Sequence, residues 1–213
     1  MFRRLVANLR MYRDFLAGWW KYRHRLKRDD EWIRRYAQAK GLQVNPHRMF
    51  YTNLKIWIEE NRDLYGNQYC PCFEPTGDPA FDRKLLCPCH FALADIEAKG
   101  TCHCVLFGRA GLTEAEWAAA EAELKREYRP RLNLVGNRLD TRGQPKDPRR
   151  GLDVPDAMHQ VKQALTAVKG DLTVVVGQPG SVENLKRLAR VRGFGFESRQ
   201  LAPEAYEVTL RRP

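Results

Sequence analysis

Six cysteines lie close together in the sequence and form three Cys-x-Cys units. An iron–sulfur cluster uses four thiolate ligands, so six cysteines leave two sulfur atoms over. Because each cysteine has another cysteine two positions away, the remaining two must lie beside the cluster. The pattern predicts a metal cluster in contact with a dithiol, which is a redox centre. The three units are Cys70-Pro71-Cys72, Cys87-Pro88-Cys89 and Cys102-His103-Cys104.

The expected compartment supports this interpretation of the cysteines. The chain contains no run of about 18 apolar residues, so we expect no transmembrane segment. Its longest uncharged N-terminal stretch, Phe15 to Trp20, is too short for a secretory signal. We therefore expect a cytoplasmic protein. The reducing cytoplasm disfavours structural disulfides and favours metal binding or redox catalysis.

The positive charge is concentrated at the N-terminus. The formal net charge of the 213 residues is +11, and residues 1–30 contribute +6 of it through nine Lys and Arg against three Asp. A positive field attracts acidic partners, which include nucleic acid, an anionic membrane and a small acidic protein. The charge alone does not choose among these three classes.

Three helices are predicted before the first cysteine. Residues 1–28 have apolar side chains three and four positions apart between basic ones, which predicts a cationic amphipathic helix. Its apolar stripe is expected to pack on the body of the protein or on a second copy, with membrane-surface attachment or partner docking as alternatives. A second helix, Asp30 to Lys40, is expected to have Asp30 or Asp29 as its N-cap and to end at Gly41. A third, from His47 to about Leu64, leads into the cysteines. The stripe comprises Phe2, Leu5, Leu9, Tyr12, Leu16, Trp19 and Tyr22.

Capping residues and helix-breaking Gly and Pro residues predict the elements around and after the cysteines. Residues 91–98 are expected to form a short helix that Gly100 stops. Thr113 and Glu116 have the spacing of a capping box, which opens a helix that Pro130 ends. Residues 129–153 hold several Pro and Gly breaks among six arginines, and we expect the domain boundary there.

The C-terminal part has alternating element types. A strand near residues 137–141, a helix over 155–168, a strand over 172–176, a helix over 181–192 and two final strands predict the order β-α-β-α-β-β. That order describes a compact two-layer α+β sandwich. We therefore predict an α+β protein with a helical extension (1–30), a cysteine-bearing domain (31–128), a linker (129–136) and the sandwich (137–213).

Two Cys-Pro-Cys units followed by Cys-His-Cys resemble the catalytic subunit of ferredoxin:thioredoxin reductase. The resemblance extends from about Glu31 to Phe107 and includes the stretches EWIRRYAQAKGLQVNP and CHCVLF. It implies a mainly helical domain wrapped around a 4Fe–4S cluster. It also implies that Cys72 and Cys104 form a redox disulfide. The cluster ligands that it implies are Cys70, Cys87, Cys89 and Cys102.

The same resemblance implies a disulfide reductase that receives electrons one at a time from ferredoxin and reduces thioredoxin or a related protein. Cys72 would attack the partner disulfide, and Cys104 would lie against the cluster. His103, between Cys102 and Cys104, is placed to protonate a leaving thiolate near neutral pH. Its alternative role is a hydrogen bond to a cluster sulfur. The spacing departs from the plant type in a shorter first gap and a longer second gap between units.

Residues from about 137 onward resemble a TusA/SirA-like sulfur-carrier domain through RGLDVPDAMHQVKQAL and GQPGSVENLKRLARVRGFGFES. The functional cysteine of that family would precede Pro155, where this chain has Val154, and no cysteine follows Cys104. The domain is therefore not expected to carry sulfur, and it could instead position a sulfur-transfer partner. Residues 177–181 form either an anion-holding loop or a plain strand-to-helix turn.

Two other functions compete with the reductase. In the first, Cys and His ligands fold a zinc-stabilised module whose basic arm binds nucleic acid. Zinc sites usually have two to four residues between paired cysteines, and six cysteines overfill one tetrahedral site, so we favour the reductase and expect no nucleic acid. In the second, the same redox chemistry acts on a low-molecular-weight or persulfide substrate.

Overall fold

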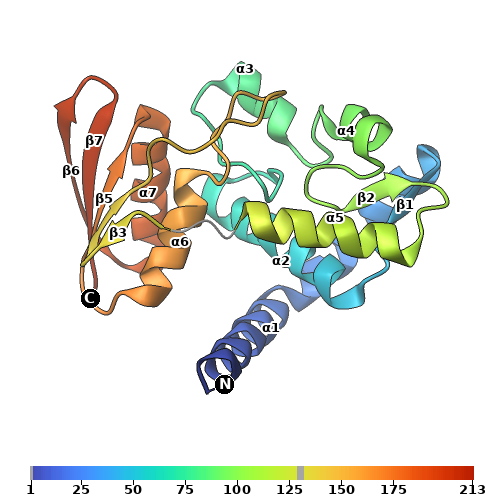
Figure 1. The fold of residues 1–213 in the computed structure, drawn as a ribbon, viewed down its shortest axis with the longest axis horizontal. Helices are drawn as coiled ribbons and strands as arrows, with labels where there is room; N and C mark the ends of the chain where they lie inside the picture. The colour runs from blue at the N-terminus through green and yellow to red at the C-terminus, as the bar shows by residue number, and fades with distance from the viewer. Residues whose placement is uncertain (1, 129–131) are drawn as a thin grey trace.

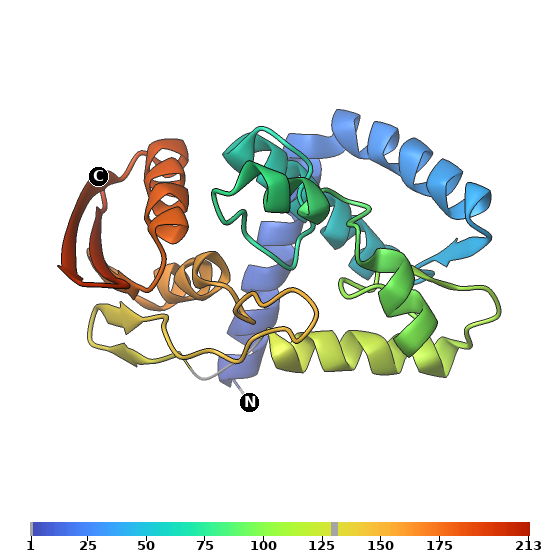
Figure 2. The ribbon, with the colours of Figure 1, turned by 90° about the horizontal axis from the view of Figure 1, so that it is seen from above.

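The computed structural model describes the backbone of residues 2–128 and 132–213, and side chains from Tyr12 onward within these ranges. The fold is mixed α+β (Figures 1 and 2). Within these ranges, no helix is long and apolar enough to cross a membrane. The predicted linker begins at residues 129–131, which lie outside the described residues together with the expected helix end at Pro130.

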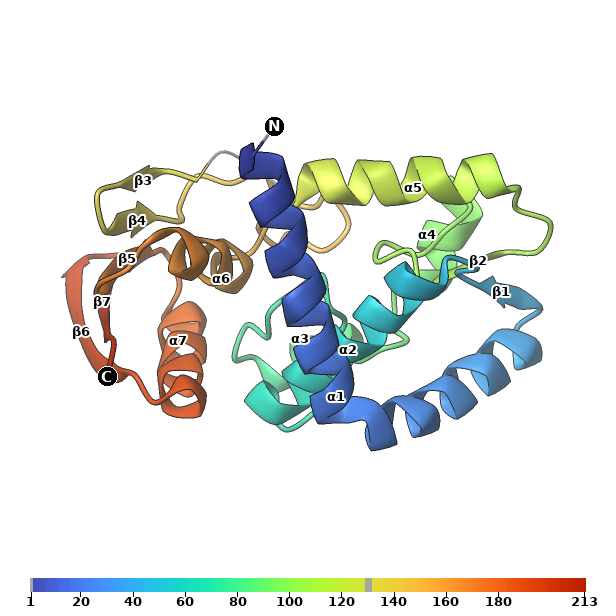
Figure 3. The same ribbon diagram turned by 90° about the horizontal axis from the view of Figure 1, so that it is seen from below.

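Residues 2–39 form one helix, α1 (Phe2–Ala39), so the prediction of two separate helices is wrong. Figure 3 shows that α1 bends, with its two arms pointing in different directions. The expected N-cap residues do not cap a helix here. Asp29 is buried and accepts a hydrogen bond from Trp32 Nε1, whereas Asp30 accepts one from Tyr51 Oη of helix α2 (Arg48–Tyr65). Both carboxylates therefore bind other side chains, and α1 continues through both residues without a cap.

Only part of the predicted apolar stripe of the first helix packs on the body of the protein. Tyr22 is buried against α2, where its hydroxyl donates to Asp63. By contrast, Tyr12, Leu16 and Trp19 are 50%, 58% and 44% exposed. The face that contacts α2 is rotated away from the stripe, so most of its described members face outward.

The core that holds the cysteines is built by helices that precede them in the sequence and by a helix that follows them. Helix α2 (Arg48–Tyr65) packs along α1, and the short strands β1 (Leu42–Val44) and β2 (Phe107–Arg109) pair antiparallel. Helix α5 (Glu114–Glu127) starts at the predicted Thr113 capping box, which is confirmed. The largest side chains of this core include Ile33, Leu54, Ile58, Phe73, Leu85, Leu106, Phe107 and Trp117.

Short elements connect the cysteine units. Between the first two units lie α3 (Pro79–Asp82) and a 3₁₀ turn (Arg83–Leu85). Between the second and third lies α4 (Ala92–Lys99), which ends at Gly100 as predicted. The longer second gap therefore holds a helix, and that helix borders the cysteines on one side.

The C-terminal part is a five-stranded sheet with two helices. Its strands have the order β3-β4-β5-β7-β6, with β4 and β5 parallel and the other neighbours antiparallel. Figures 1 and 2 show both helices between the sheet and the cysteine-bearing part. The predicted order of elements is present, preceded by the short strand β3. The elements are β3 (Leu134–Val135), β4 (Arg138–Asp140), α6 (Ala157–Ala167), β5 (Leu172–Val176), α7 (Pro179–Arg192), β6 (Gly195–Ala202) and β7 (Ala205–Arg211).

The start of α7 lies against the loop that follows Cys72. Ser181 Oγ donates to Glu74 Oε1 at 2.7 Å, and Asn184 Nδ2 donates to the Pro75 carbonyl oxygen at 2.8 Å. Glycine is required at position 180, because a Cβ atom there would lie 2.0 Å from the Thr76 carbonyl oxygen. The loop after Cys72 and the C-terminal helix are therefore in backbone contact.

Candidate metal centre

All six cysteines are free thiols buried in one core. Backbone hydrogen bonds hold the first two units side by side, because Cys70 N donates to Leu85 O and Cys87 N donates to Gln68 O, both at 2.8 Å. The third unit is attached to the first residue of strand β2, because Cys102 N donates to Phe107 O at 2.9 Å. Segments that are separate in the sequence thus converge on one point.

The third unit lies in a tight turn. Val105 N donates to Cys102 O at 2.8 Å, and Val105 has a φ of 58°. A β-branched residue rarely adopts this left-handed conformation, which costs about 1–3 kcal/mol. The surrounding core, in which Val105 and Leu106 are buried, holds the turn closed beside Cys104.

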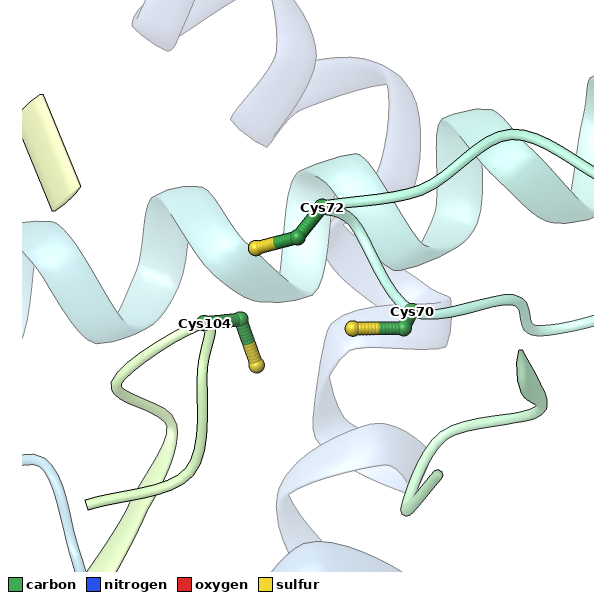
Figure 4. A group of neighbouring side chains, drawn as sticks. All are labelled: Cys70, Cys72 and Cys104. Carbon is green, nitrogen blue, oxygen red and sulfur yellow. The ribbon is translucent and has the colours of Figure 1, made fainter. Parts of the chain in front are cut away.

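The sulfur atoms of the cysteines face one another. The Sγ atoms of Cys70, Cys72 and Cys104 all lie within 4.8 Å of one another (Figure 4). Cys102 Sγ is 3.7 Å from Cys104 Sγ. A small cavity between the units is lined by Cys87 and Cys89 together with Cys70, Cys102 and Cys104. The structure thus brings all six together, and the closest trio combines one predicted ligand with the two residues of the predicted disulfide.

The thiols influence one another's ionisation. Hydrogen bonds from the thiols of Cys104, Cys72 and Cys89 hold the pKa of Cys70 well below its usual range. Burial raises the pKa of the Cys72 and Cys87 thiols well above theirs. A buried thiolate surrounded by thiol donors is a favourable ligand for a metal cation, because the thiolate is the form that binds metal.

His103 is buried beside the cysteines, at the position that the sequence predicts. Its Nδ1 lies 3.7 Å from Asp147 Oδ2, and its Nε2 lies 3.4 Å from Glu127 Oε2 and 3.5 Å from Tyr128 Oη. The Tyr128 hydroxyl donates to the Cys72 carbonyl oxygen. The imidazole therefore connects the third cysteine unit to two carboxylates that can orient its ring.

Sequence reasoning missed Asp147 and Arg150, which come from the segment interpreted as a domain boundary. The Arg150 side chain is fully buried and donates to Asp95 and Asp147. Its Nη2 lies 4.0 Å from Cys89 Sγ, and its guanidinium lies 4.8 Å from the centre of the Phe73 ring. No local signal distinguishes it from the other arginines of residues 129–153, because its contacts with Asp95, Cys89 and Phe73 are far away in the sequence.

The residues present fit an iron–sulfur cluster. Such a cluster needs four thiolates, and six buried cysteines supply them with two to spare. Among the described residues, the buried Arg150 Nε has no hydrogen-bond partner. An N–H group that is buried without a partner is costly, and an anionic group held by the cysteines would supply an acceptor.

Two carboxyls near this site have raised pKa values. Burial raises the pKa of Glu74 to about 8 and that of Asp156 to about 6. Both residues line a second cavity between the loop after Cys72 and the segment 146–156. In the folded protein they therefore hold protons over a pH range in which the unfolded chain has released them.

A Glu74→Gln variant should remove part of the pH dependence of stability. A carboxyl whose pKa is raised by folding stabilises the protein below its unfolded pKa of about 4.3, and this contribution is lost as the pH rises through the folded value. The melting temperature of the wild type should thus fall between about pH 5 and 8, and that of Glu74→Gln should fall less. Thermal melts across this range test the prediction. The control Glu183→Gln changes an exposed residue of α7 and should keep the wild-type slope; equal slopes in all three proteins would contradict the prediction.

Comparison with known proteins agrees with this site. The family model described as "Ferredoxin thioredoxin reductase catalytic beta chain" matches residues 21–128. No curated protein matches the chain. The matched range contains all six cysteines and His103, and it ends before Asp147 and Arg150. The family is associated with an iron–sulfur cluster, which the buried cysteines can hold. The chain therefore belongs to the family of ferredoxin thioredoxin reductase catalytic beta chains.

Proposed function

We propose that this protein is an iron–sulfur disulfide reductase that takes electrons one at a time from ferredoxin and reduces thioredoxin or a related protein disulfide. The observation that carries the proposal is the burial of six free cysteines in one group, more than a single cluster consumes. Ferredoxin near −400 mV and a thioredoxin couple near −270 mV differ by about 130 mV, or roughly 6 kcal/mol for two electrons. Reduction in this direction is therefore favourable.

The cysteines are proposed to divide into four ligands and one dithiol. The cavity between the units is lined by all four proposed ligands and also by Cys104, which agrees with a dithiol whose Cys104 lies against the cluster. These residues would hold a 4Fe–4S cluster, which when bound supplies storage for single electrons. Cys72 and Cys104 remain as the dithiol, and their Sγ atoms lie within 4.8 Å of each other. The proposed ligands are Cys70, Cys87, Cys89 and Cys102.

The dithiol reduces its acceptor in two exchange steps. The Cys72 thiol gives up its proton and its sulfur attacks the acceptor disulfide, so that a mixed disulfide forms, the acceptor S–S bond breaks and the acceptor sulfur that leaves takes up a proton. The Cys104 thiolate then attacks Cys72, which closes the Cys72–Cys104 disulfide and releases the second acceptor thiol. Two electrons from two ferredoxin molecules and two protons restore the dithiol.

His103 is proposed to handle the protons of these exchanges. Its ring lies between the third cysteine unit and the carboxylates of Glu127 and Asp147. The carboxylates can orient the ring, so that His103 can give a proton to a leaving thiolate and take one up again from solvent. Cys72 and Cys104 are only 2% and 3% exposed, so the acceptor reaches Cys72 only after neighbouring residues move.

Anaerobic purification tests the proposed function. The protein should be brown, should contain about four iron and four sulfide ions per chain, and should reduce thioredoxin when reduced ferredoxin is supplied. The measurements are metal analysis, the absorption spectrum and thiol formation. A colourless protein with zinc would overturn the reductase and favour the zinc-stabilised module.

We propose that the chain comprises a helical extension (1–30), a catalytic domain (31–128), a linker (129–136) and a TusA/SirA-like domain (137–213). The order of elements in the C-terminal sheet and the proline at position 155 support the last assignment, although Val154 stands where the family has its cysteine. Without a cysteine, this domain would position a sulfur-transfer partner instead of carrying sulfur. The contact between Ser181 and Glu74, next to the loop that follows Cys72, would place such a partner near the dithiol.

A further inference from the structure

The segment 145–154 places the buried guanidinium of Arg150 beside the cysteines. It folds back on itself, because Asp147 N donates to Leu152 O and Val154 N donates to Pro145 O, both at 2.8 Å. The Asp147 carboxylate accepts hydrogen bonds from the backbone N–H groups of Arg149 and Arg150. Gly151 closes the turn with a φ of 68°. This segment is thus a preorganised turn with Arg150 at its tip.

Arg150 is held rigidly from every side. Asp95 of α4 and Asp147 accept from its terminal nitrogens, and the Phe73 and Phe91 rings lie 4.8 and 4.6 Å from its guanidinium. Its side chain is 0% exposed. Water and salt therefore screen its charge far less than they screen a surface arginine.

The position of this charge matters because of what lies next to it. Nη2 is 4.0 Å from Cys89 Sγ, and Nε has no partner among the described residues. The reduction potential of an iron–sulfur centre depends on its net charge, on hydrogen bonds to its sulfur atoms and on its solvent exposure. Arg150 affects the first two of these, because it is a cation and an N–H donor beside a proposed ligand.

We propose that Arg150 is a positioning residue of the redox site, which raises the potential at which the site accepts an electron by holding a positive charge beside Cys89. The inference rests on the proposed function. It extends the site beyond the residues 21–128 that the family model matches, to a turn of the segment after them. The C-terminal part therefore completes the electrostatic environment of the cysteines.

An Arg150→Gln variant tests the inference through the reduction potential. Loss of the cation leaves Asp95 and Asp147 beside the site, so the reduced state becomes less favourable. We expect the one-electron equilibrium with a fixed reductant to shift at least tenfold toward the oxidised form. A tenfold shift lowers the reduction potential of the site by about 59 mV. The measurement is a dithionite titration with redox mediators on the purified protein, followed by absorption and electron paramagnetic resonance.

The chain offers a matched control for charge. Arg149 is the adjacent arginine and also binds Asp95, but its side chain is 35% exposed. Arg149→Gln makes the same formal change in charge, and we expect it to shift the potential by much less than Arg150→Gln. Equal shifts in both variants would overturn the inference, because a general charge effect would then explain them.

Two further variants keep the test decisive if Arg150→Gln folds poorly. Arg150→Lys retains the cation and should stay close to the wild-type potential. Asp95→Asn removes a negative charge and should shift the potential in the opposite direction, toward positive values. A wild type with iron whose potential is unchanged by Asp95→Asn and Arg150→Gln would overturn only this inference. A wild type without iron would overturn the proposed function and this inference together.

Discussion

A Cys72→Ser variant should lose all measurable disulfide reduction and keep the iron content of the wild type. The thiolate is the nucleophile of disulfide exchange, and a serine hydroxyl cannot replace it near neutral pH. Cys72 is held by its main chain, since its carbonyl oxygen accepts from Tyr128 Oη. The substitution should thus leave the surrounding structure in place. Thioredoxin reduction with ferredoxin as donor and iron analysis on the same sample measure the two properties.

Cys104→Ser is the matched control for this experiment. It retains the attacking sulfur and lacks the one that closes the second exchange, so the acceptor should remain attached to Cys72 as a mixed disulfide. Mass spectrometry or a non-reducing gel detects this adduct, and a reducing agent should release it. An adduct that forms on Cys72→Ser instead would assign the attacking role to Cys104 and contradict the proposed order.

A Cys87→Ala variant should lose the cluster. Cys87 is a proposed ligand that lines the cavity between the units but does not belong to the closest trio of sulfur atoms. Removing one of four thiolates leaves an incomplete ligand set, so the iron content should fall from about four per chain to less than one. Iron analysis and the visible spectrum measure the loss. The melting temperature should fall as well, since a ligand that binds only the folded state stabilises it.

Cys104→Ala separates two assignments of the metal ligands. If the ligands are the four proposed, Cys104→Ala should retain its iron, and Cys87→Ala should lose it. The closest trio, Cys70, Cys72 and Cys104, would give the opposite pattern if it bound the metal itself. Loss of metal in Cys104→Ala with retention in Cys87→Ala would therefore contradict the proposed division into ligands and dithiol.

Local sequence signals predicted the elements that end at strong boundaries. Helix α5 begins at its Thr113 capping box and α4 ends at Gly100, because these signals act within a few residues. The same reasoning failed at Asp29 and Asp30. An Asp can cap a helix or bind a distant partner, and here Tyr51, 21 residues after Asp30, decided between the two. Capping preferences are weaker than a buried set of tertiary contacts.

The exposed stripe of α1 shows another limit of periodicity. A spacing of three and four residues predicts an amphipathic helix, and the described part of α1 is helical as expected. Periodicity does not say which face another element covers. Helix α2 approaches the face that carries Gly18 and Tyr22, where the absence of a side chain at Gly18 permits close contact with Ile56. The stripe with Leu16 and Trp19 is therefore left outside.

The sequence by itself determined that six cysteines in three close pairs would form one redox-capable group, because the spacing is short and the residue type is specific. It also identified His103, which is covalently fixed between two of them. Only the tertiary structure placed Arg150 and Asp147 at this group. Arg150 meets Asp95 across 55 residues of sequence, and no short-range pattern encodes such a contact. Folding of the segment 145–154 onto the core places an ordinary basic sequence beside the cysteines.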